Sequence, residues 1–211
     1  CPAKQDGKDS LIVVTHGWTS RELNPFSAPN PTCIDQMPTA IDQYFVNGGQ
    51  NDWQILGYKW VQKSWTVFPD DALNNAKQEG QKLGNCISAQ HRSHVHLIAH
   101  SAGAALIQAA SEVIKSNSPN TAVHCTFLDA FVGSDSAGIA NYGKGTDWSD
   151  NYFSRDALTG GERWQLTEGP LDNTYNVDTT QLDTQNKVWL GLYWSTSDGR
   201  IEQCYRTESK H

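Results

Sequence analysis

A serine set between small residues is the first position in this sequence whose surroundings favour chemistry. Ser101 follows the alternating segment HVHLIAH and stands within the pentapeptide AHSAG. The residues before it predict a strand and those after it a helix, so the chain must turn sharply here. Small residues on both sides let strand and helix approach, and the turn exposes Oγ above the sheet. We predict a nucleophile elbow at residues 99–103; the alternative is a tight turn whose serine only caps the helix.

A second strand end offers groups that could stabilise negative charge. Residues 10–14 form a β-branched run typical of strands buried on both faces, and the tripeptide HGW follows shortly after. Sites of open α/β sheets lie at the carboxyl ends of strands, so this segment should lie beside Ser101. Acyl transfer needs N–H donors aimed at a developing oxyanion. We expect the backbone N–H groups of Trp18 and Ala102 to be these donors, and His16 to support the loop.

The elements that must position these groups alternate along the chain. Alternation of short apolar runs with helical patterns favours a mostly parallel sheet flanked by helices, an α/β fold. Asp70 and Asp71 offer an N-cap for a helix whose apolar residues recur at steps of three and four as far as Ile87. We predict strands at 10–14, 53–60, 94–99 and 123–128, a further helix at 104–115, and later strands at 174–180 and 187–195. Residues 1–211 are expected to form one domain.

Two long segments without a sustained period interrupt this alternation. Residues 21–38 contain four prolines, and residues 133–169 are rich in Gly, Ser, Asp and Trp. We predict both as loops. Loops of this length either cover a functional site or are surface decoration.

Three motifs together resemble a known family. The HGW after a hydrophobic strand, the segment HLIAHSAGAAL and the segment TFLDAF are similar to the lipase branch of the α/β-hydrolase superfamily, especially its pancreatic-lipase-like group, over roughly residues 10–132. Ala99 stands where relatives more often have glycine, and alanine is still small. The resemblance implies an α/β-hydrolase fold, a secreted, periplasmic or cell-surface location, and hydrolysis of carboxylic esters by a Ser-Asp-His triad in chain order.

The acid of the implied triad should follow the strand after the elbow. Asp129 is there, in TFLDAF, at the end of an apolar run where an unpaired charge would be costly. A base histidine would be a suitable partner. Asp129 could instead cap the next loop, and Asp178, at the end of a later candidate strand, is the alternative acid.

The base is selected by chain order, because His211 is the one histidine that follows Asp129. Relatives continue past this histidine with an aromatic-proline segment, so we expect the natural chain to extend further. The alternative is that His211 is a tag remnant or an uninvolved terminal residue. His100 is set aside, since neighbouring side chains on a strand point to opposite sides.

The other histidines and the cysteines suggest structural roles. His94 and His96 share one strand face, which could indicate a metal site, but buried, hydrogen-bonded histidines are the favoured interpretation, and His124 should be structural. The five cysteines form no C-x-x-C pair, so disulfides are open and a zinc site is not expected. Cys125 should be a buried core residue, and Cys1 either a lipidated terminus or a truncated start.

Composition excludes some classes of partner. The net charge is −7, and no cluster of Lys and Arg could follow a phosphate backbone, so nucleic acid is not an expected partner. The apolar runs are too short for a membrane span. We expect an ester or lipid substrate and no cofactor or metal. The alternatives are a hydrolase-like domain that binds lipid or protein without catalysis, and an amidase or peptidase with the same triad.

Overall fold

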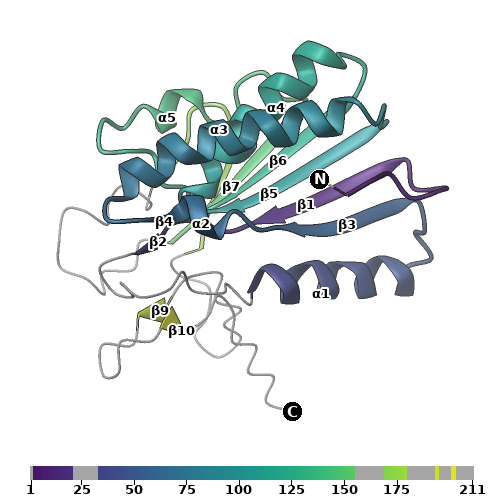
Figure 1. Ribbon diagram of the computed structural model, residues 1–211, viewed down its shortest axis with the longest axis horizontal. Helices are drawn as coiled ribbons and strands as arrows, with labels where there is room; N and C mark the ends of the chain where they lie inside the picture. Colours follow the sequence, from purple (N-terminus) through teal and green to yellow (C-terminus); the bar gives the residue numbers. More distant parts are fainter. Residues whose placement is uncertain (1, 21–32, 155–168, 180–192, 195–200, 203–211) are drawn as a thin grey trace.

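A parallel sheet forms the centre of the molecule (Figure 1). The computed structural model describes residues 2–20, 33–154, 169–179, 193–194 and 201–202. Six strands pair in the order β3-β1-β5-β6-β7-β8, and every pair is parallel. The strands are β1 (Ser10–Thr15), β3 (Trp53–Tyr58), β5 (His94–His100), β6 (Ala122–Leu128), β7 (Trp148–Phe153) and β8 (Tyr175–Asp178).

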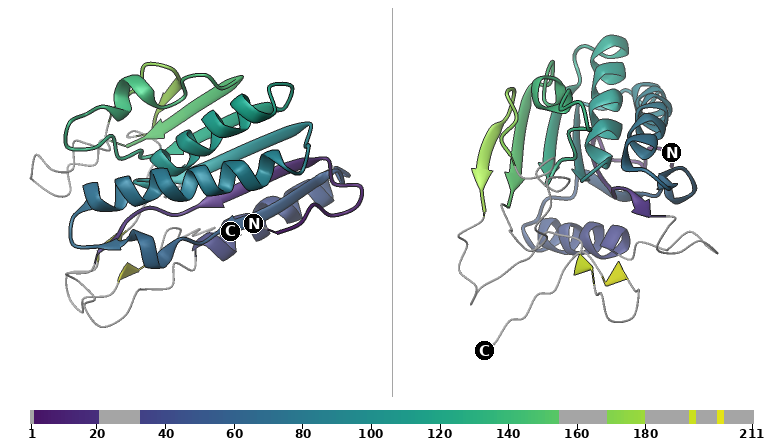
Figure 2. Two further views of the ribbon diagram at one scale, coloured as in Figure 1. Left: turned by 45° about the horizontal axis from the view of Figure 1, so that its top comes forward. Right: turned by 90° about the vertical axis from the view of Figure 1, so that its left-hand side faces the viewer.

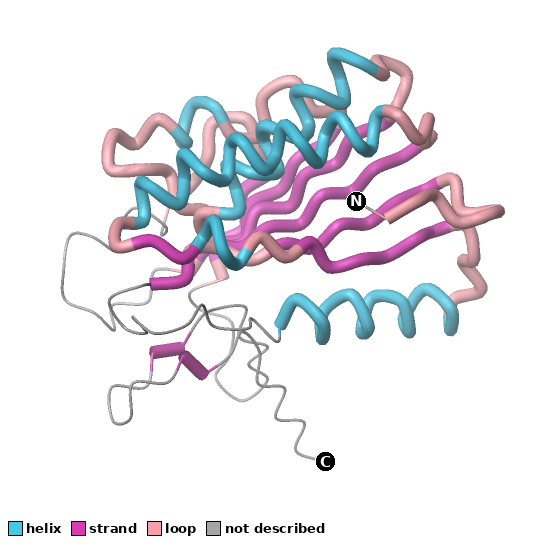
Figure 3. Tube along the Cα trace, viewed as in Figure 1, coloured by secondary structure: helices cyan, strands magenta, loops and turns pink. Residues whose placement is uncertain are grey.

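Helices flank this sheet, and short strand pairs lie outside it (Figure 3). The helices are α1 (Cys33–Asn47), α2 (Val61–Ser64), α3 (Pro69–Ser88), α4 (Gly103–Asn117) and α5 (Gly138–Asn141). The short strands are β2 (Thr19–Ser20), which pairs with β4 (Trp65–Thr66), and β9 (Tyr193–Trp194), which pairs with β10 (Ile201–Glu202). The predicted α/β fold, with a mostly parallel sheet flanked by helices, is confirmed.

Strand β1, which lies between β3 and β5, is buried on both faces, as predicted from its β-branched run. Leu11 and Val13 join the core beneath α3 and α4, whereas Ile12 and Val14 join the smaller core that α1 covers. Figure 2 shows these helices on opposite sides of the sheet. Successive side chains of a strand point to opposite faces, so a continuous apolar run is needed wherever helices cover both.

Helix α3 begins earlier than predicted. Its N-cap is Phe68, and Pro69 occupies the first helical turn together with Asp70 and Asp71. Proline is well suited to the start of a helix because the N–H it lacks would have no partner there. The two aspartates therefore do not cap the helix; they favour it by placing negative charge beside its N-terminal dipole.

Three elements lie wholly or partly where loops were predicted: α1, the short helix α5, and β7. Helix α1 contains Pro38, which removes one helical hydrogen bond, but Met37, Ile41 and Phe45 still follow at steps of four and pack against β1 and β3. Strand β7 was missed because its core-facing side includes the polar side chains of Ser149 and Asn151. Most of the predicted strand at 187–195 lies outside the described residues.

Candidate active site

The chain turns sharply at Ser101, between β5 and α4. This residue has φ of 52°, in the left-handed region that residues other than glycine rarely adopt. The Ser101 N–H donates to the carbonyl of Leu128 at 3.0 Å, and the Ser101 carbonyl accepts from the N–H of Phe131 at 3.2 Å. The backbone after β6 therefore holds the strained turn in place. Strain of this kind persists only where surrounding contacts impose it, and it is concentrated at active sites.

The residues around Ser101 must be small for the turn to fit. A Cβ added to Gly103 would lie 2.6 Å from the carbonyl oxygen of His16 and 3.3 Å from the Cβ of Ala99. The N-cap of α4 is Ala102, and no side-chain hydrogen bond caps the helix. Ser101 is therefore not the N-cap residue of α4.

The segment after β1 lies against Ser101. A Cβ added to Gly17 would lie 2.6 Å from the Cβ of Ser101, 3.1 Å from its Oγ and 2.9 Å from the carbonyl oxygen of His100. Two strand ends that are 84 residues apart in the sequence thus meet at one point, as expected for neighbouring parallel strands.

Two N–H groups near Ser101 can donate to a ligand. Among the described residues, the hydrogen bonds of loops and turns include none donated by the backbone N–H of Trp18 or of Ala102. Ala102 precedes the first residue of α4, where backbone N–H groups point out of the helix and favour negative charge. The indole of Trp18 donates to the carbonyl of Thr66 at 3.0 Å, which fixes this residue beside β4.

Asp129 lies at the end of the strand next to that of Ser101. It has φ of 44°, its N–H donates to the carbonyl of Tyr152 at 2.9 Å, and its Oδ1 accepts from the N–H of Ser154 at 2.9 Å. The side chain is half-buried. A carboxylate held by a backbone N–H group in this way has a fixed direction and can accept hydrogen bonds from more than one donor.

Asp178 is further from Ser101. It ends β8 and is exposed, three strands away from β5 in the sheet order. At the usual spacing of strands this is roughly 14 Å. His211, the predicted base, lies outside the described residues.

The two described histidines nearest Ser101 are held in the neutral form. Burial lowers the pKa of His16 to about 4, and burial lowers that of His100 to about 4 as well. His16 uses both ring nitrogens: Nε2 accepts from the N–H of Trp60 at 3.1 Å, and Nδ1 contacts the carbonyl of Gly17 at 2.8 Å. Neither histidine is suited to remove a proton at neutral pH.

Sequence reasoning missed Trp60 as a neighbour of the site. Its ring stacks on His16 with centroids 5.4 Å apart, and its indole N–H donates to the carbonyl of His16 at 2.8 Å. The two residues are separated by 44 positions. The sequence did offer one signal for this contact: Trp60 ends the predicted strand 53–60, and His16 follows the predicted strand 10–14.

His96 and His124 form a cluster with Thr126 and Asp150 on the face of the sheet away from α3 and α4. His96 contacts the hydroxyl of Thr126 at 2.8 Å and stacks on His124 at 3.8 Å, and His124 lies 3.4 Å from Asp150. Hydrogen bonding of His96 fits the structural interpretation of this position. In the part of the chain that the structure describes, no group of three or more His, Cys, Asp or Glu side chains could hold a metal ion.

The structure defines the state of two cysteines, one free and one in a disulfide. Cys125 is a free, buried core residue, as predicted, and burial raises the pKa of its thiol to about 12. Cys86 takes part in a disulfide.

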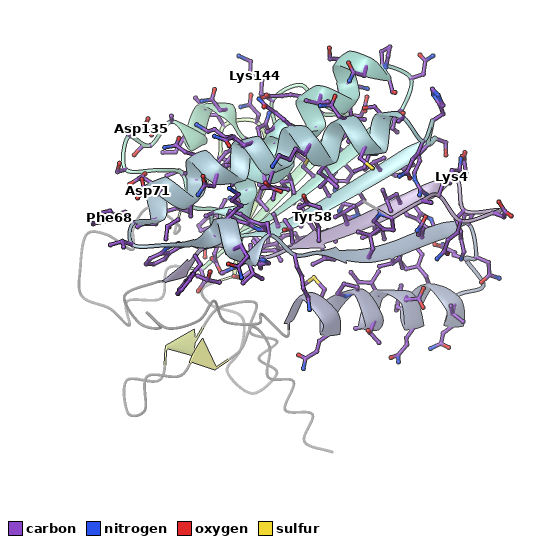
Figure 4. All side chains as sticks on the ribbon, viewed as in Figure 1. Lys4, Tyr58, Phe68, Asp71, Asp135 and Lys144 are labelled. Atoms are coloured by element: carbon purple, nitrogen blue, oxygen red, sulfur yellow. The ribbon has the colours of Figure 1, made fainter. Side chains whose placement is uncertain are left out.

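A cavity of about 370 Å³ lies away from Ser101, between α3, α4 and the segment around α5. Asp70, Glu112, Asp135 and Tyr142 are among its lining residues, and neither Ser101 nor Asp129 is. Figure 4 shows Asp135 at the same end of the molecule as Asp71 and Phe68. This cavity is therefore not a pocket beside the candidate catalytic groups.

No protein-family model matches this chain, and no curated protein sequence matches it significantly. Over the described residues, none of the helices is both long enough and apolar enough to cross a membrane.

Proposed function

We propose that this protein is a serine hydrolase with an α/β-hydrolase fold that cleaves carboxylic esters, as a lipase or esterase, through an acyl-enzyme on Ser101. The observation that supports this most directly is the left-handed Ser101 between β5 and α4, packed against Gly17. A serine that only turns the chain has no need of a strained backbone, which glycine would adopt freely. Residues 99–103 then form a nucleophile elbow, which presents Oγ at the carboxyl edge of the sheet.

The proposed reaction has two steps. His211 removes the proton of the Ser101 hydroxyl as Oγ attacks the ester carbonyl, and the N–H groups of Trp18 and Ala102 stabilise the oxyanion. Collapse of the tetrahedral intermediate breaks the ester bond, and the alcohol leaves with the proton that His211 held. Water, deprotonated by His211, then attacks the acyl group and releases the acid and free Ser101.

Asp129 is proposed as the residue that orients His211. Its strand, β6, pairs directly with β5, and the backbone of Ser101 is hydrogen-bonded to Leu128 and Phe131 on either side of it. A carboxylate in this place fixes the tautomer of a base histidine and stabilises the imidazolium formed during attack. Asp178 lies too far along the sheet for this role.

The proposed location outside the cytoplasm is supported by the disulfide at Cys86. Disulfides persist in oxidising compartments and are rare in cytosolic proteins. The proposed substrate is an ester or lipid, with its acyl chain length set by the loops around the site.

A fluorophosphonate probe tests the proposal, because it labels an activated serine without requiring knowledge of the substrate. We expect labelling of the unaltered chain, its loss in Ser101→Ala, and its retention in Ser136→Ala. Ser136 is the matched control, since it also has a positive φ, of 59°. A folded, unlabelled chain would contradict the proposal and favour a binding domain without catalysis. Faster turnover of amides than of matched esters would favour an amidase or peptidase.

A further inference from the structure

We propose that Trp60 is a positioning residue for the oxyanion site: through His16 it fixes the direction of the Trp18 backbone N–H. This inference rests on the proposed function, because it assigns Trp18 as an oxyanion donor. It concerns a residue on the segment after β3, outside the three motifs around Ser101, Asp129 and the HGW tripeptide.

Trp60 holds His16 by three contacts. The backbone N–H of Trp60 donates to His16 Nε2 at 3.1 Å, and its indole N–H donates to the His16 carbonyl at 2.8 Å. The two rings stack with an interplanar angle of 18°. Both residues are 4% exposed, so water does not compete for these groups.

These contacts define the state of the His16 ring. A backbone N–H can only donate, so Nε2 must be the unprotonated acceptor and Nδ1 must carry the proton. Nδ1 then donates to the carbonyl of Gly17 at 2.8 Å. Burial, which disfavours the charged form of His16, keeps the ring in this neutral tautomer.

The carbonyl of Gly17 and the N–H of Trp18 belong to one peptide unit. None of the described peptide bonds is cis, so the carbonyl and the N–H of this planar unit point in opposite directions. When His16 fixes the carbonyl of Gly17, it also fixes the N–H of Trp18. Trp60 therefore determines, through the imidazole and the carbonyl of His16, where the proposed oxyanion donor points.

The loop at Gly17 and Trp18 is also held by two contacts that do not involve His16 or Trp60. Gly17 packs on Ser101, and the indole of Trp18 is bound to the carbonyl of Thr66. The loop position is thus set by Ser101 and Thr66, whereas the rotation of the peptide between Gly17 and Trp18 is left to His16 and Trp60. Loss of the Trp60 contacts should tilt a donor and leave substrate binding largely unchanged.

The test compares Trp60→Phe with Trp53→Phe. Phenylalanine keeps an aromatic ring against His16 and the backbone N–H, but removes the indole donor to the His16 carbonyl. Trp53 is the matched control, because it lies at the opposite end of β3 and makes an edge contact with His94. Active sites are titrated with a fluorophosphonate, so that kcat is expressed per competent serine. Turnover of a short-chain p-nitrophenyl ester is measured together with inhibition by a trifluoromethyl ketone, which adds to serine and forms an oxyanion.

We expect Trp60→Phe to lower kcat by about 10-fold to 100-fold, somewhat less than complete loss of one oxyanion donor. KM should stay within about twofold, and the inhibition constant of the ketone should rise by the same factor as kcat falls. Trp53→Phe should leave all three within about twofold.

Unchanged kcat and ketone affinity in folded Trp60→Phe would overturn the positioning role and leave Trp60 as a core residue. An unaltered chain that the fluorophosphonate does not label would overturn the proposed function as well, so the two failures are distinct. If Trp60→Phe does not fold, 3-benzothienylalanine at position 60 replaces the N–H by sulfur in nearly the same shape, and the same outcomes apply.

Discussion

Gly17 and Ser101 contact each other across the ends of β1 and β5, so closely that a Cβ on residue 17 would lie 2.6 Å from the Cβ of Ser101. Glycine is required at position 17 because there is no room for a side chain. Its φ is not among the positive values of the described glycines, so a left-handed backbone is not the reason for glycine here. A Cβ on residue 17 would also lie 2.9 Å from the carbonyl oxygen of His100. The need for glycine therefore comes from the close packing around Ser101.

Gly17→Ala should therefore reduce activity far more than stability. The added methyl group must push the loop away from Ser101, which moves the N–H of Trp18 from the oxyanion. We expect kcat per folded molecule to fall about 100-fold or more, the loss typical of one missing oxyanion donor. Ester turnover and thermal unfolding are measured on the same preparations. Gly169→Ala is the control, because a Cβ there meets nothing within 4 Å. Equal activity of the two variants would show that Gly17 is not part of the site.

Asp129→Asn separates the two candidate acids. Asparagine keeps the Oδ1 acceptor for the N–H of Ser154, so the loop should stay folded. It cannot stabilise an imidazolium, and we expect kcat to fall about 10³-fold to 10⁴-fold. Asp178→Asn should change kcat by less than about threefold, because β8 lies three strands from β5. The reverse order of effects in steady-state ester hydrolysis would assign the acid to Asp178.

The sequence was most informative where local pattern and tertiary role coincide. The continuous apolar run of β1 and the alternating pattern of β5 both predicted strands that the structure contains. Helix α1 and strand β7 were missed because tertiary packing outweighs their local signals: Pro38 breaks a helical pattern, and Asn151 is a fully buried polar side chain in a strand.

Contacts between distant residues were beyond the sequence for a different reason. The HGW segment was expected beside Ser101, but nothing in a single sequence records that the indole of Trp60 meets His16 or how closely Gly17 approaches Ser101. Both follow from the register that places the end of β1 beside the ends of β3 and β5. Ser101 and Asp129 could be proposed from the sequence because their signals are local: an apolar run ends in a small serine motif at Ser101 and in a lone carboxylate at Asp129.

Gly80→Ala should destabilise the protein although alanine favours helices. Gly80 lies in α3 where it packs on α4, and an added Cβ would meet the carbonyl oxygen of Leu106 and lie 2.9 Å from the Cβ of Ala109. Higher helix propensity contributes about 1 kcal/mol in favour of alanine, whereas overpacking against backbone costs about 1–3 kcal/mol. We expect a net loss of up to about 2 kcal/mol in urea unfolding. Asn74→Ala, at an exposed position of α3, changes propensity alone and should be neutral or stabilising. A gain in stability for Gly80→Ala would contradict the close helix contact.

Acid should weaken the fold before the carboxylates titrate, because several histidines are held neutral. Burial, together with the neighbouring His124 and His94, lowers the pKa of His96 to about 3, although Asp150 opposes this shift. In the unfolded chain the same ring takes up a proton near pH 6.5. Between these values the unfolded state binds one more proton than the folded state, so the free energy of unfolding falls as the pH is lowered from 6.5 towards 3.

His96→Gln tests this directly. Glutamine keeps a polar group near the hydroxyl of Thr126 and removes the titration. Each such histidine contributes up to about 1.4 kcal/mol per pH unit to the slope, so the variant should show a slope lower by up to that amount between pH 4.5 and 6. Urea unfolding at a series of pH values measures it, with Asn74→Ala, which removes no titratable group from an exposed position, as the control that keeps the original slope. If His96→Gln also keeps that slope, His96 accepts its proton while the protein is folded, and the buried histidine cluster is not the source of acid sensitivity.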